Sequence, residues 1–272
     1  MTTRFERVRD YYAHHDESSR LCTPEGQLER TRLLDQIGRH VPSGSRVLDL
    51  GGGPGTYTVE LARQGYRVVL ADLSPTLLEQ ARAVVAAANV IDHVESIDEV
   101  NALDLGRYPD GHFDAVLCAG PLYHLVDPEE RSRAVAEVCR ILRPGGRAFF
   151  VYLPRLVGLT GLVDRAVDRP DQVPPSTLAE ATANGVFRSG ATDGFQEGYY
   201  PTPDQMRALM HGCGLEAVDE LSLRSAAFGR SEALAALTGP HRAALHQMIE
   251  DLCRDPAMVS TGGPALLICR RL

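Results

Sequence analysis

The sequence has no excess of positive charge and no basic stretch. Its 272 residues include 28 Lys and Arg against 36 Asp and Glu, which gives a formal net charge of −8 and an isoelectric point near 5.6. Proteins that bind nucleic acid usually gather Lys and Arg on one face, where they contact phosphates. The composition therefore argues against a nucleic-acid partner and favours a small or neutral one.

Metal-binding motifs, disulfide frameworks and membrane segments are also missing from the sequence. The six cysteines stand far apart, without a C-x-x-C pair or a histidine at zinc-site spacing, so we expect reduced thiols and no metal site. Cys118 and Cys269 lie within apolar runs and are expected in the core. The charged N-terminal stretch lacks the apolar region of a signal peptide, and no apolar run reaches membrane-spanning length. We therefore expect a cytoplasmic protein without a membrane partner.

Short apolar segments alternate with longer helical patterns from residue 46 onward, which is typical of parallel strands joined by crossover helices. Ser74 before Pro75 indicates a helix start, because serine caps helix N-termini and proline fits the first turn. The alternation predicts the α/β class, with a doubly wound, mostly parallel seven-stranded sheet and helices on both faces. The expected strands are 46–50, 66–72, 96–100, 113–119, 146–153, 215–223 and 263–272.

A glycine-rich turn, VLDLGGGPGTY at residues 47–57, follows the first expected strand. A strand ending in an acid, then glycines, then a helix is the order of a nucleotide-type site at the carboxyl edge of a sheet. The dinucleotide pattern G-x-G-x-x-G fails, because Thr56 stands where the third glycine belongs when counted from Gly51. The pattern present is D-x-G-x-G-x-G, formed by Asp49, Gly51, Gly53 and Gly55.

This motif resembles the first motif of the class I S-adenosylmethionine-dependent methyltransferases. The resemblance covers residues 30–153 closely and the remainder by the order of elements. It extends to PDGHFDAVL (109–117) and RILRPGGRAFF (140–150), which resemble the lead-ins to the family's fourth and fifth strands. The resemblance implies a Rossmann-like fold and a loop whose bare backbone makes room for the cofactor S-adenosyl-L-methionine.

The resemblance also implies the residues that hold this cofactor. Asp72, at the end of the second strand, is expected to accept both hydroxyls of a ribose. Asn101 stands where the family commonly has Asp, and its amide oxygen can still accept from an adenine amino group. For Asp49 and Asp72, capping of the following loop or helix is the alternative. The expected cofactor-binding residues are Asp49, Gly51, Gly52, Gly53, Gly55, Asp72, Leu73, Asn101, Ala102, Ala119 and Gly120.

Two segments carry candidate catalytic residues. In AGPLYHL (119–125), Tyr123 or His124 is placed to accept a proton from a substrate; the alternative is that Tyr123 packs and His124 caps the helix that starts near residue 127. In the leading arm, a helix would place Tyr11 and His15 on one face, where they can close over the positively charged sulfonium. Surface positions are the alternative for the arm's histidines.

The rhythm of strands and helices divides the chain into four parts. Residues 1–45 form a helical arm or cap, 46–153 the cofactor-binding core, 154–200 an inserted lid over the acceptor site, and 201–272 the rest of the core sheet. A segment as long as 154–200 between sheet elements is usually functional. Its aromatic residues either line the acceptor site or form the lid's own core: Phe187, Phe195, Tyr199 and Tyr200.

These patterns predict an adenosylmethionine-dependent methyltransferase that acts on an oxygen or nitrogen of a small metabolite. Methylation of RNA or protein is one alternative; the net acidity disfavours it, as does GPLY in place of an N/D-P-P-Y base-pocket motif after the fourth strand. A catalytically silent adenosylmethionine-binding protein is the other. The oligomeric state does not follow from the sequence.

Overall fold

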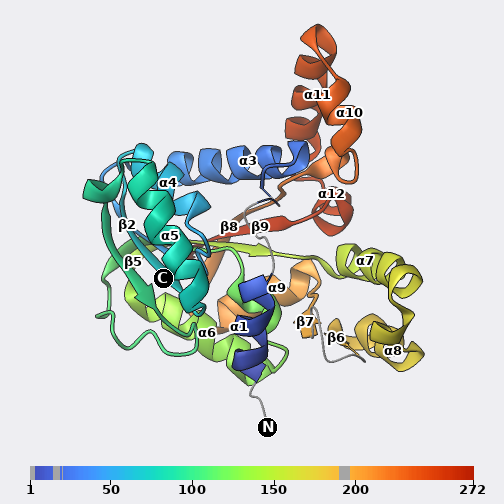
Figure 1. Ribbon diagram of the computed structural model, residues 1–272, viewed down its shortest axis with the longest axis horizontal. Coiled ribbons are helices and arrows are strands. Elements are labelled where there is room, and N and C mark those ends of the chain that lie inside the picture. Colours follow the sequence, from blue (N-terminus) through green and yellow to red (C-terminus); the bar gives the residue numbers. More distant parts are fainter. Residues whose placement is uncertain (1–3, 15–18, 20, 190–196) are drawn as a thin grey trace.

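The computed structural model describes residues 4–14, 19, 21–189 and 197–272. Its centre is a seven-stranded sheet in the order β3-β2-β1-β4-β5-β9-β8 (Figure 1). The strands β1 to β5 pair in parallel, and β9 runs antiparallel to both of its neighbours, β5 and β8. The predicted doubly wound, mostly parallel sheet is therefore confirmed. The sheet strands are β1 (Arg46–Leu50), β2 (Arg67–Asp72), β3 (Val94–Glu99), β4 (Phe113–Cys118), β5 (Leu142–Tyr152), β8 (Leu215–Ser222) and β9 (Ala265–Arg271).

Helices cover both faces of this sheet because successive side chains of each buried strand point to opposite sides. In β1, Val47 joins the hydrophobic cluster under α3, α4 and α5, whereas Leu48 and Leu50 join the cluster under α6 and α9. Cys118 and Cys269 are buried in these clusters, as expected. The covering helices are α3 (Pro24–His40), α4 (Thr56–Arg63), α5 (Pro75–Ala87), α6 (Pro128–Ile141) and α9 (Pro203–Gly212).

Helix starts follow the capping signals in the sequence. Ser74 accepts a hydrogen bond from the Leu77 amide at the start of α5. Thr202 and Gln205 form a reciprocal capping box at the start of α9, in which each side chain accepts a hydrogen bond from the other's backbone N–H. These local bonds satisfy amides that a helix N-terminus leaves without partners, and α5 begins where Ser74 and Pro75 predict.

The boundaries of two strands differ from the prediction. β3 begins and ends earlier than the expected 96–100. β5 begins at Leu142 rather than at residue 146, because Leu142 pairs with Phe113 before the register shifts and Arg147 pairs with Ala115. The intervening RPGG residues are accommodated as an irregularity of the ladder, where proline and glycine are tolerated.

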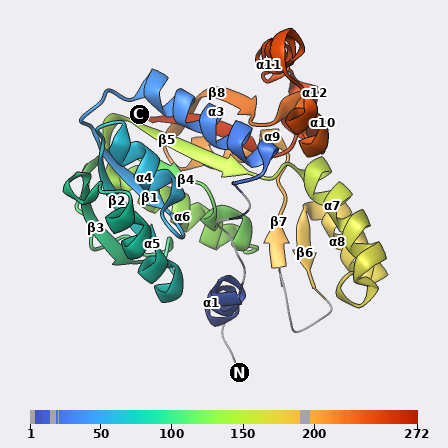
Figure 2. The same cartoon turned by 45° about the horizontal axis from the view of Figure 1, so that its top comes forward.

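The insertion between β5 and α9 has more regular structure than the sequence pattern indicated. It contains α7 (Arg155–Asp168), the short helix η3 (Pro170–Gln172), α8 (Pro175–Asn184) and a hairpin of β6 (Val186–Arg188) and β7 (Glu197–Tyr199). These elements lie to one side of the sheet, away from β2 and β3 (Figure 2). The apolar residues of α7 pack in a hydrophobic cluster that belongs to the insertion itself.

A second group of helices, which the sequence prediction missed, lies between β8 and β9. Arg224 anchors it to α3 through ion pairs with Glu25 and Glu29, at 2.9 and 2.7 Å. The group projects from the sheet (Figure 1). Within the described residues, no helix is both long and apolar enough to span a bilayer. The elements of this group are η4 (Ser225–Ala227), α10 (Ser231–Ala236), α11 (Gly239–Leu252) and α12 (Pro256–Thr261).

Candidate functional site

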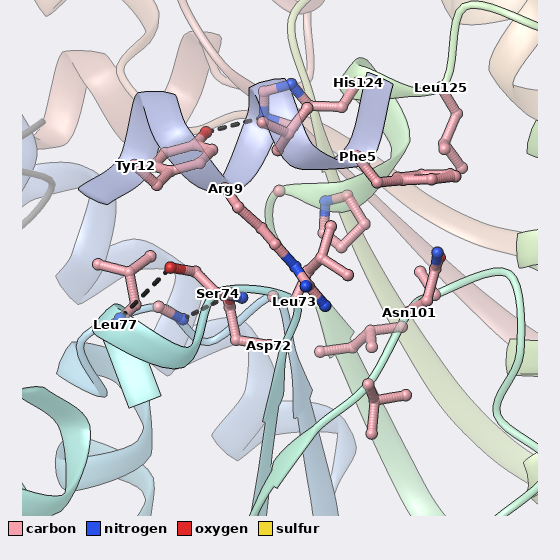
Figure 3. Close-up of a pocket in the computed structure, with 18 of the residues that line it drawn as sticks. Phe5, Arg9, Tyr12, Asp72, Leu73, Ser74, Leu77, Asn101, His124 and Leu125 are labelled. Carbon is pink, nitrogen blue, oxygen red and sulfur yellow. Dashed lines mark hydrogen bonds between the residues drawn. The ribbon is translucent and has the colours of Figure 1, made fainter. Parts of the chain in front are cut away.

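A pocket lies at the carboxyl edge of the sheet, where β1, β2 and β4 end, beneath the N-terminal helix α1 (Arg4–His14). Figure 3 shows side chains converging on it from α1, from the loop after β2 and from the loop after β4. In open α/β sheets this edge is where ligands bind. The pocket is lined by Arg4, Phe5, Val8, Arg9, Tyr12, Leu50, Gly51, Gly53, Asp72, Leu73, Ser74, Leu77, Val100, Asn101, Ala102, Ala119, Gly120, Pro121, Tyr123, His124 and Leu125.

Two of the four predicted loop glycines line this pocket, Gly51 and Gly53, and both have positive φ, +74° and +53°. A Cβ on Gly53 would have only Leu77 nearby, at 3.9 Å, so it would project into the open pocket. Gly52 and Gly55 face the interior instead. A Cβ on Gly52 would lie 2.8 Å from Asp49 Oδ2, and one on Gly55 would lie 3.3 Å from the Cβ of Ala81. Their part in the site is therefore to let the loop pack closely, not to touch a ligand.

Asp49 lies behind the glycine loop and does not line the pocket, contrary to its expected place among the cofactor-binding residues. Strand alternation points it to the same side as Val47, where Thr58 of α4 donates a hydrogen bond to Oδ2 at 2.7 Å. The carboxyl group is fully buried, and burial raises its pKa to about 6 despite the bond from Thr58. Asp49 therefore supports the loop through Thr58, which agrees with the structural alternative.

Asp72 lies at the opposite rim of the loop and lines the pocket. Its Oδ2 accepts from the backbone amide of Gly53 at 2.9 Å, and its Oδ1 accepts from that of Ser74 at 2.8 Å. The carboxylate thus ties the glycine loop to the start of α5, and Figure 3 shows it beside Ser74 and Leu73. Each carboxylate oxygen has lone pairs to spare, so Asp72 can also accept from a ligand.

The part of the pocket beyond Asp72 is formed by Leu73, Val100, Asn101 and Ala102. Asn101 Oδ1 accepts a hydrogen bond from the Leu103 amide at 3.0 Å. An amide oxygen has two acceptor sites, so one acceptor and the side-chain NH₂ group remain for a ligand. This end is mostly apolar with one polar side chain, which suits a flat heteroaromatic ring.

The other end of the pocket carries a hydrogen-bonded group of three side chains. Tyr123 and His124 belong to the short helix η2 (Pro121–His124), and Tyr12 reaches them from α1. The Tyr12 hydroxyl lies 2.9 Å from the Tyr123 hydroxyl and 2.8 Å from His124 Nε2. Burial, together with the charge of Arg4, lowers the pKa of His124 to about 3. The imidazole is therefore neutral at physiological pH.

The structure decides between the two expectations for His124, a pocket residue or the cap of the following helix. The cap of α6 is Asp127, whose side chain accepts from the Glu129 amide, so His124 does not cap that helix. Both His124 and Tyr123 line the pocket.

Tyr12, which sequence reasoning missed, takes the place expected for Tyr11. Phe5, Val8 and Tyr12 recur on one helical face and point into the pocket, whereas Tyr11 is not a lining residue and packs edge-on against Tyr12 at 5.1 Å. The apolar period of α1 was the signal that identifies this face. His15, the other arm candidate, lies outside the described residues.

Ion pairs hold α1 over the pocket. Arg9 pairs with Glu99 of β3 at 2.7 Å, and Arg4 pairs with Glu130 of α6 at 2.5 Å. Arg4 also lies 3.5 Å from Glu197 of β7. The helix therefore contacts both the core sheet and the insertion, and it lies between them in Figures 1 and 2.

The insertion flanks the pocket instead of roofing it with aromatic rings. Phe187 and Tyr200 are buried in the insertion's own cluster with Leu162, and Tyr199 packs with Val126. None of these three aromatic residues lines the pocket, and Phe195 lies outside the described residues. Phe187 and Tyr200 therefore form the insertion's own core, one of the two expectations for these rings, whereas Tyr199 packs between the insertion and the core domain.

Comparison with known proteins identifies the core. Residues 47–146 match the sequence model of a family described as a methyltransferase domain. Over 134 residues the chain is 37% identical to a ubiquinone biosynthesis O-methyltransferase of Xanthomonas axonopodis pv. citri (strain 306), a match that covers 48% of this chain and 53% of that protein. The chain thus spans about half the length of this curated relative.

Solved structures show the same fold. A SAM-dependent methyltransferase from Methanosarcina mazei matches with a TM-score of 0.60 at 19% identity, over 87% of this chain and 97% of that one. The 1,6-didemethyltoxoflavin-N1-methyltransferase of Burkholderia thailandensis, crystallised with 1,6-didemethyltoxoflavin and S-adenosylhomocysteine, matches with a TM-score of 0.59 at 15% identity, over 98% and 86%. Residues 47–146 of this chain thus match a methyltransferase domain, and the chain has the fold of these methyltransferase structures.

Proposed function

We propose that this protein transfers a methyl group from S-adenosyl-L-methionine to an oxygen or nitrogen atom of a small molecule. The observation that carries the proposal is the make-up of one pocket. Side-chain-free backbone at Gly51 and Gly53 and the carboxylate of Asp72 form one part of it, and the Tyr12, Tyr123 and His124 group forms the other. The cofactor-binding site and the polar acceptor end would thus belong to the same pocket.

The residues of the first part fit adenosylmethionine. Asp72 would accept from the ribose hydroxyls, and Asn101 with Ala102 would contact the adenine. The open space at the Cβ position of Gly53 would receive the methionine portion. This portion carries no phosphate, so it needs no Lys or Arg side chains around it. When bound, the cofactor supplies an electrophilic methyl group on a positively charged sulfur.

The residues of the second part suit a hydroxyl or amine acceptor. Methyl transfer is a displacement whose main demand is that the nucleophile be aligned behind the methyl carbon. A neutral His124, hydrogen-bonded to Tyr12, is a weak base but a good hydrogen-bonding partner. We infer that the Tyr12, Tyr123 and His124 group orients the acceptor's polar hydrogen and receives the proton only as transfer proceeds.

The comparisons support a small acceptor. The relative of Xanthomonas is named for O-methylation in ubiquinone biosynthesis, and the Burkholderia neighbour is named for N-methylation of a small heterocycle. The net charge of −8 weighs against an RNA acceptor, because binding to phosphates is driven by Lys and Arg.

The test is turnover with methyl-labelled adenosylmethionine and a panel of small phenols, carboxylic acids and amines, with adenosylhomocysteine as the measured product. We expect binding of adenosylmethionine by calorimetry and product with at least one acceptor class. Binding of NAD without adenosylmethionine would overturn the cofactor assignment. Labelled product with bulk tRNA alone would replace the small acceptor by RNA, and cofactor binding without product from any acceptor would favour a silent binding protein.

A further inference from the structure

The strand β7 contacts two structures that form the acceptor end of the pocket. It packs against η2, which carries Tyr123 and His124, and its Glu197 reaches the arginines of α1. Side chains two residues apart on a strand point to the same side, so Glu197 and Tyr199 leave β7 in a common direction. One short strand of the insertion thus meets both the helix above the pocket and the loop beside it.

The contact with η2 passes through Arg131 of α6. The guanidinium of Arg131 lies over the ring of Tyr199, 3.6 Å from its centroid. Its Nη1 donates a 2.7 Å hydrogen bond to the carbonyl oxygen of Leu125, the residue after His124 and itself part of the pocket wall. Both Arg131 and Tyr199 are buried, so this contact is shielded from solvent, where a cation–ring interaction is strongest.

The contact with α1 passes through Glu197. Its Oε1 lies 3.5 Å from Arg4 Nε and 3.8 Å from Arg7 Nη2. Arg4 also pairs with Glu130 at 2.5 Å, and its side chain is largely buried. Because Arg4 and Tyr12 belong to one rigid helix, the ion pairs at one end of α1 restrict where the Tyr12 hydroxyl lies at the other.

We propose that β7 is a positioning element for the acceptor end. Tyr199, through Arg131, holds the Leu125 carbonyl and with it η2, while Glu197, through Arg4, holds α1. Together they set the distance between the Tyr12 hydroxyl and His124 Nε2. The effect of β7 on turnover rests on the proposed methyl transfer, whereas its effect on residues 119–126 does not. The insertion thus supports the acceptor end without lining the pocket.

The first test is kinetic and uses the full chain. Tyr199→Leu removes the ring beneath Arg131, and Arg131→Lys keeps the charge but loses the planar group that stacks. We expect each to lower kcat by roughly tenfold or more, because small misplacements of reacting groups have effects of that order. The affinity for adenosylhomocysteine should fall much less than kcat, because Asp72 and Asn101 lie outside this contact. The matched control, Tyr199→Phe, keeps the ring and should match the parent protein.

The second test measures the loop without turnover. Hydrogen–deuterium exchange should become faster in residues 119–126 of Tyr199→Leu and Arg131→Lys, and in residues 4–14 of Glu197→Gln. Glu180→Gln is the matched control, because it removes a carboxylate from another ion pair of the insertion, with Arg188, and should alter neither segment.

The outcomes separate the two proposals. Unchanged exchange in residues 119–126 of both variants would overturn the positioning role, as would faster exchange throughout the chain or loss of cofactor affinity equal to the loss of kcat. If the parent protein binds adenosylhomocysteine but methylates no acceptor, the methyl transfer proposal is lost, and the exchange measurements still decide the role of β7.

Discussion

Replacement of Asp72 by Asn tests how one carboxylate serves both the loop and a ligand. In the structure its two oxygens accept from the amides of Gly53 and Ser74 at 2.9 and 2.8 Å, and only 9% of the residue is exposed. Asparagine has one acceptor oxygen and places an NH₂ group where the other stood, so one of the two backbone amides loses its partner. The ribose hydroxyls would lose a charged acceptor as well.

The magnitudes follow from these contacts. A buried donor left without a partner lowers the free energy of unfolding by about 1–3 kcal/mol, which for a chain of this size lowers Tm by roughly 2–10 °C. A lost hydrogen bond to a charged group weakens ligand binding by about 1.5–3 kcal/mol, or roughly 10- to 150-fold in Kd. Because native stability is typically about 5–15 kcal/mol, the variant stays mostly folded, so unfolding does not account for such a change in Kd.

Calorimetry with adenosylhomocysteine measures the binding change, and thermal unfolding without ligand measures the stability change. Asp72→Ala should have the larger effect on both, since neither amide keeps a side-chain acceptor. Equal affinity of Asp72→Asn and the parent protein would refute the assignment of Asp72 to the ribose. A lower affinity with unchanged Tm would instead refute its structural role in holding the loop.

Three further perturbations test the glycine loop, Asp49 and Tyr12. The methyl group of Gly53→Ala would enter the pocket, so this variant should lose adenosylhomocysteine binding with only about 1 kcal/mol of backbone strain. The methyl group of Gly52→Ala would meet the interior, so this variant should mainly lower Tm. The reverse pattern would contradict the placement of the loop. Burial raises the pKa of Asp49 from 3.8 to about 6, so this carboxyl favours the folded state when protonated and opposes folding as pH rises through 6. Asp49→Asn should therefore raise the free energy of unfolding at pH 8 by roughly 3 kcal/mol and leave it unchanged at pH 3.5. Urea titrations at the two pH values that show no such difference would refute this. Tyr12→Phe should lower kcat by about 10- to 100-fold and retain the affinity for the cofactor. Because His124 stays neutral above its pKa of about 3, the loss of kcat should be the same from pH 6 to 9. Initial rates equal to those of the parent protein would show that Tyr12 has no part in the acceptor end.

Much of the cofactor end was readable in the sequence because its determinants are local. The apolar run before Asp49, the glycines after it and the acid at the end of the second strand follow one another along the chain, and parallel pairing of β1 with β2 brings Gly51 to Asp72 without further information. The role of Asp49 was not readable, because its direction depends on strand parity relative to Thr58 in the next helix.

The sequence alone determined the succession of strands and helices along the chain, the edge at which the site forms and the loop that leaves room for a ligand, because strand alternation, helix caps and glycine conformations act over a few residues. Only the tertiary structure decided that Tyr12 meets His124, 112 positions away, and that β7 lies beside η2 and α1. Such contacts join elements far apart in the chain, and their geometry depends on how whole helices dock, which no local pattern encodes.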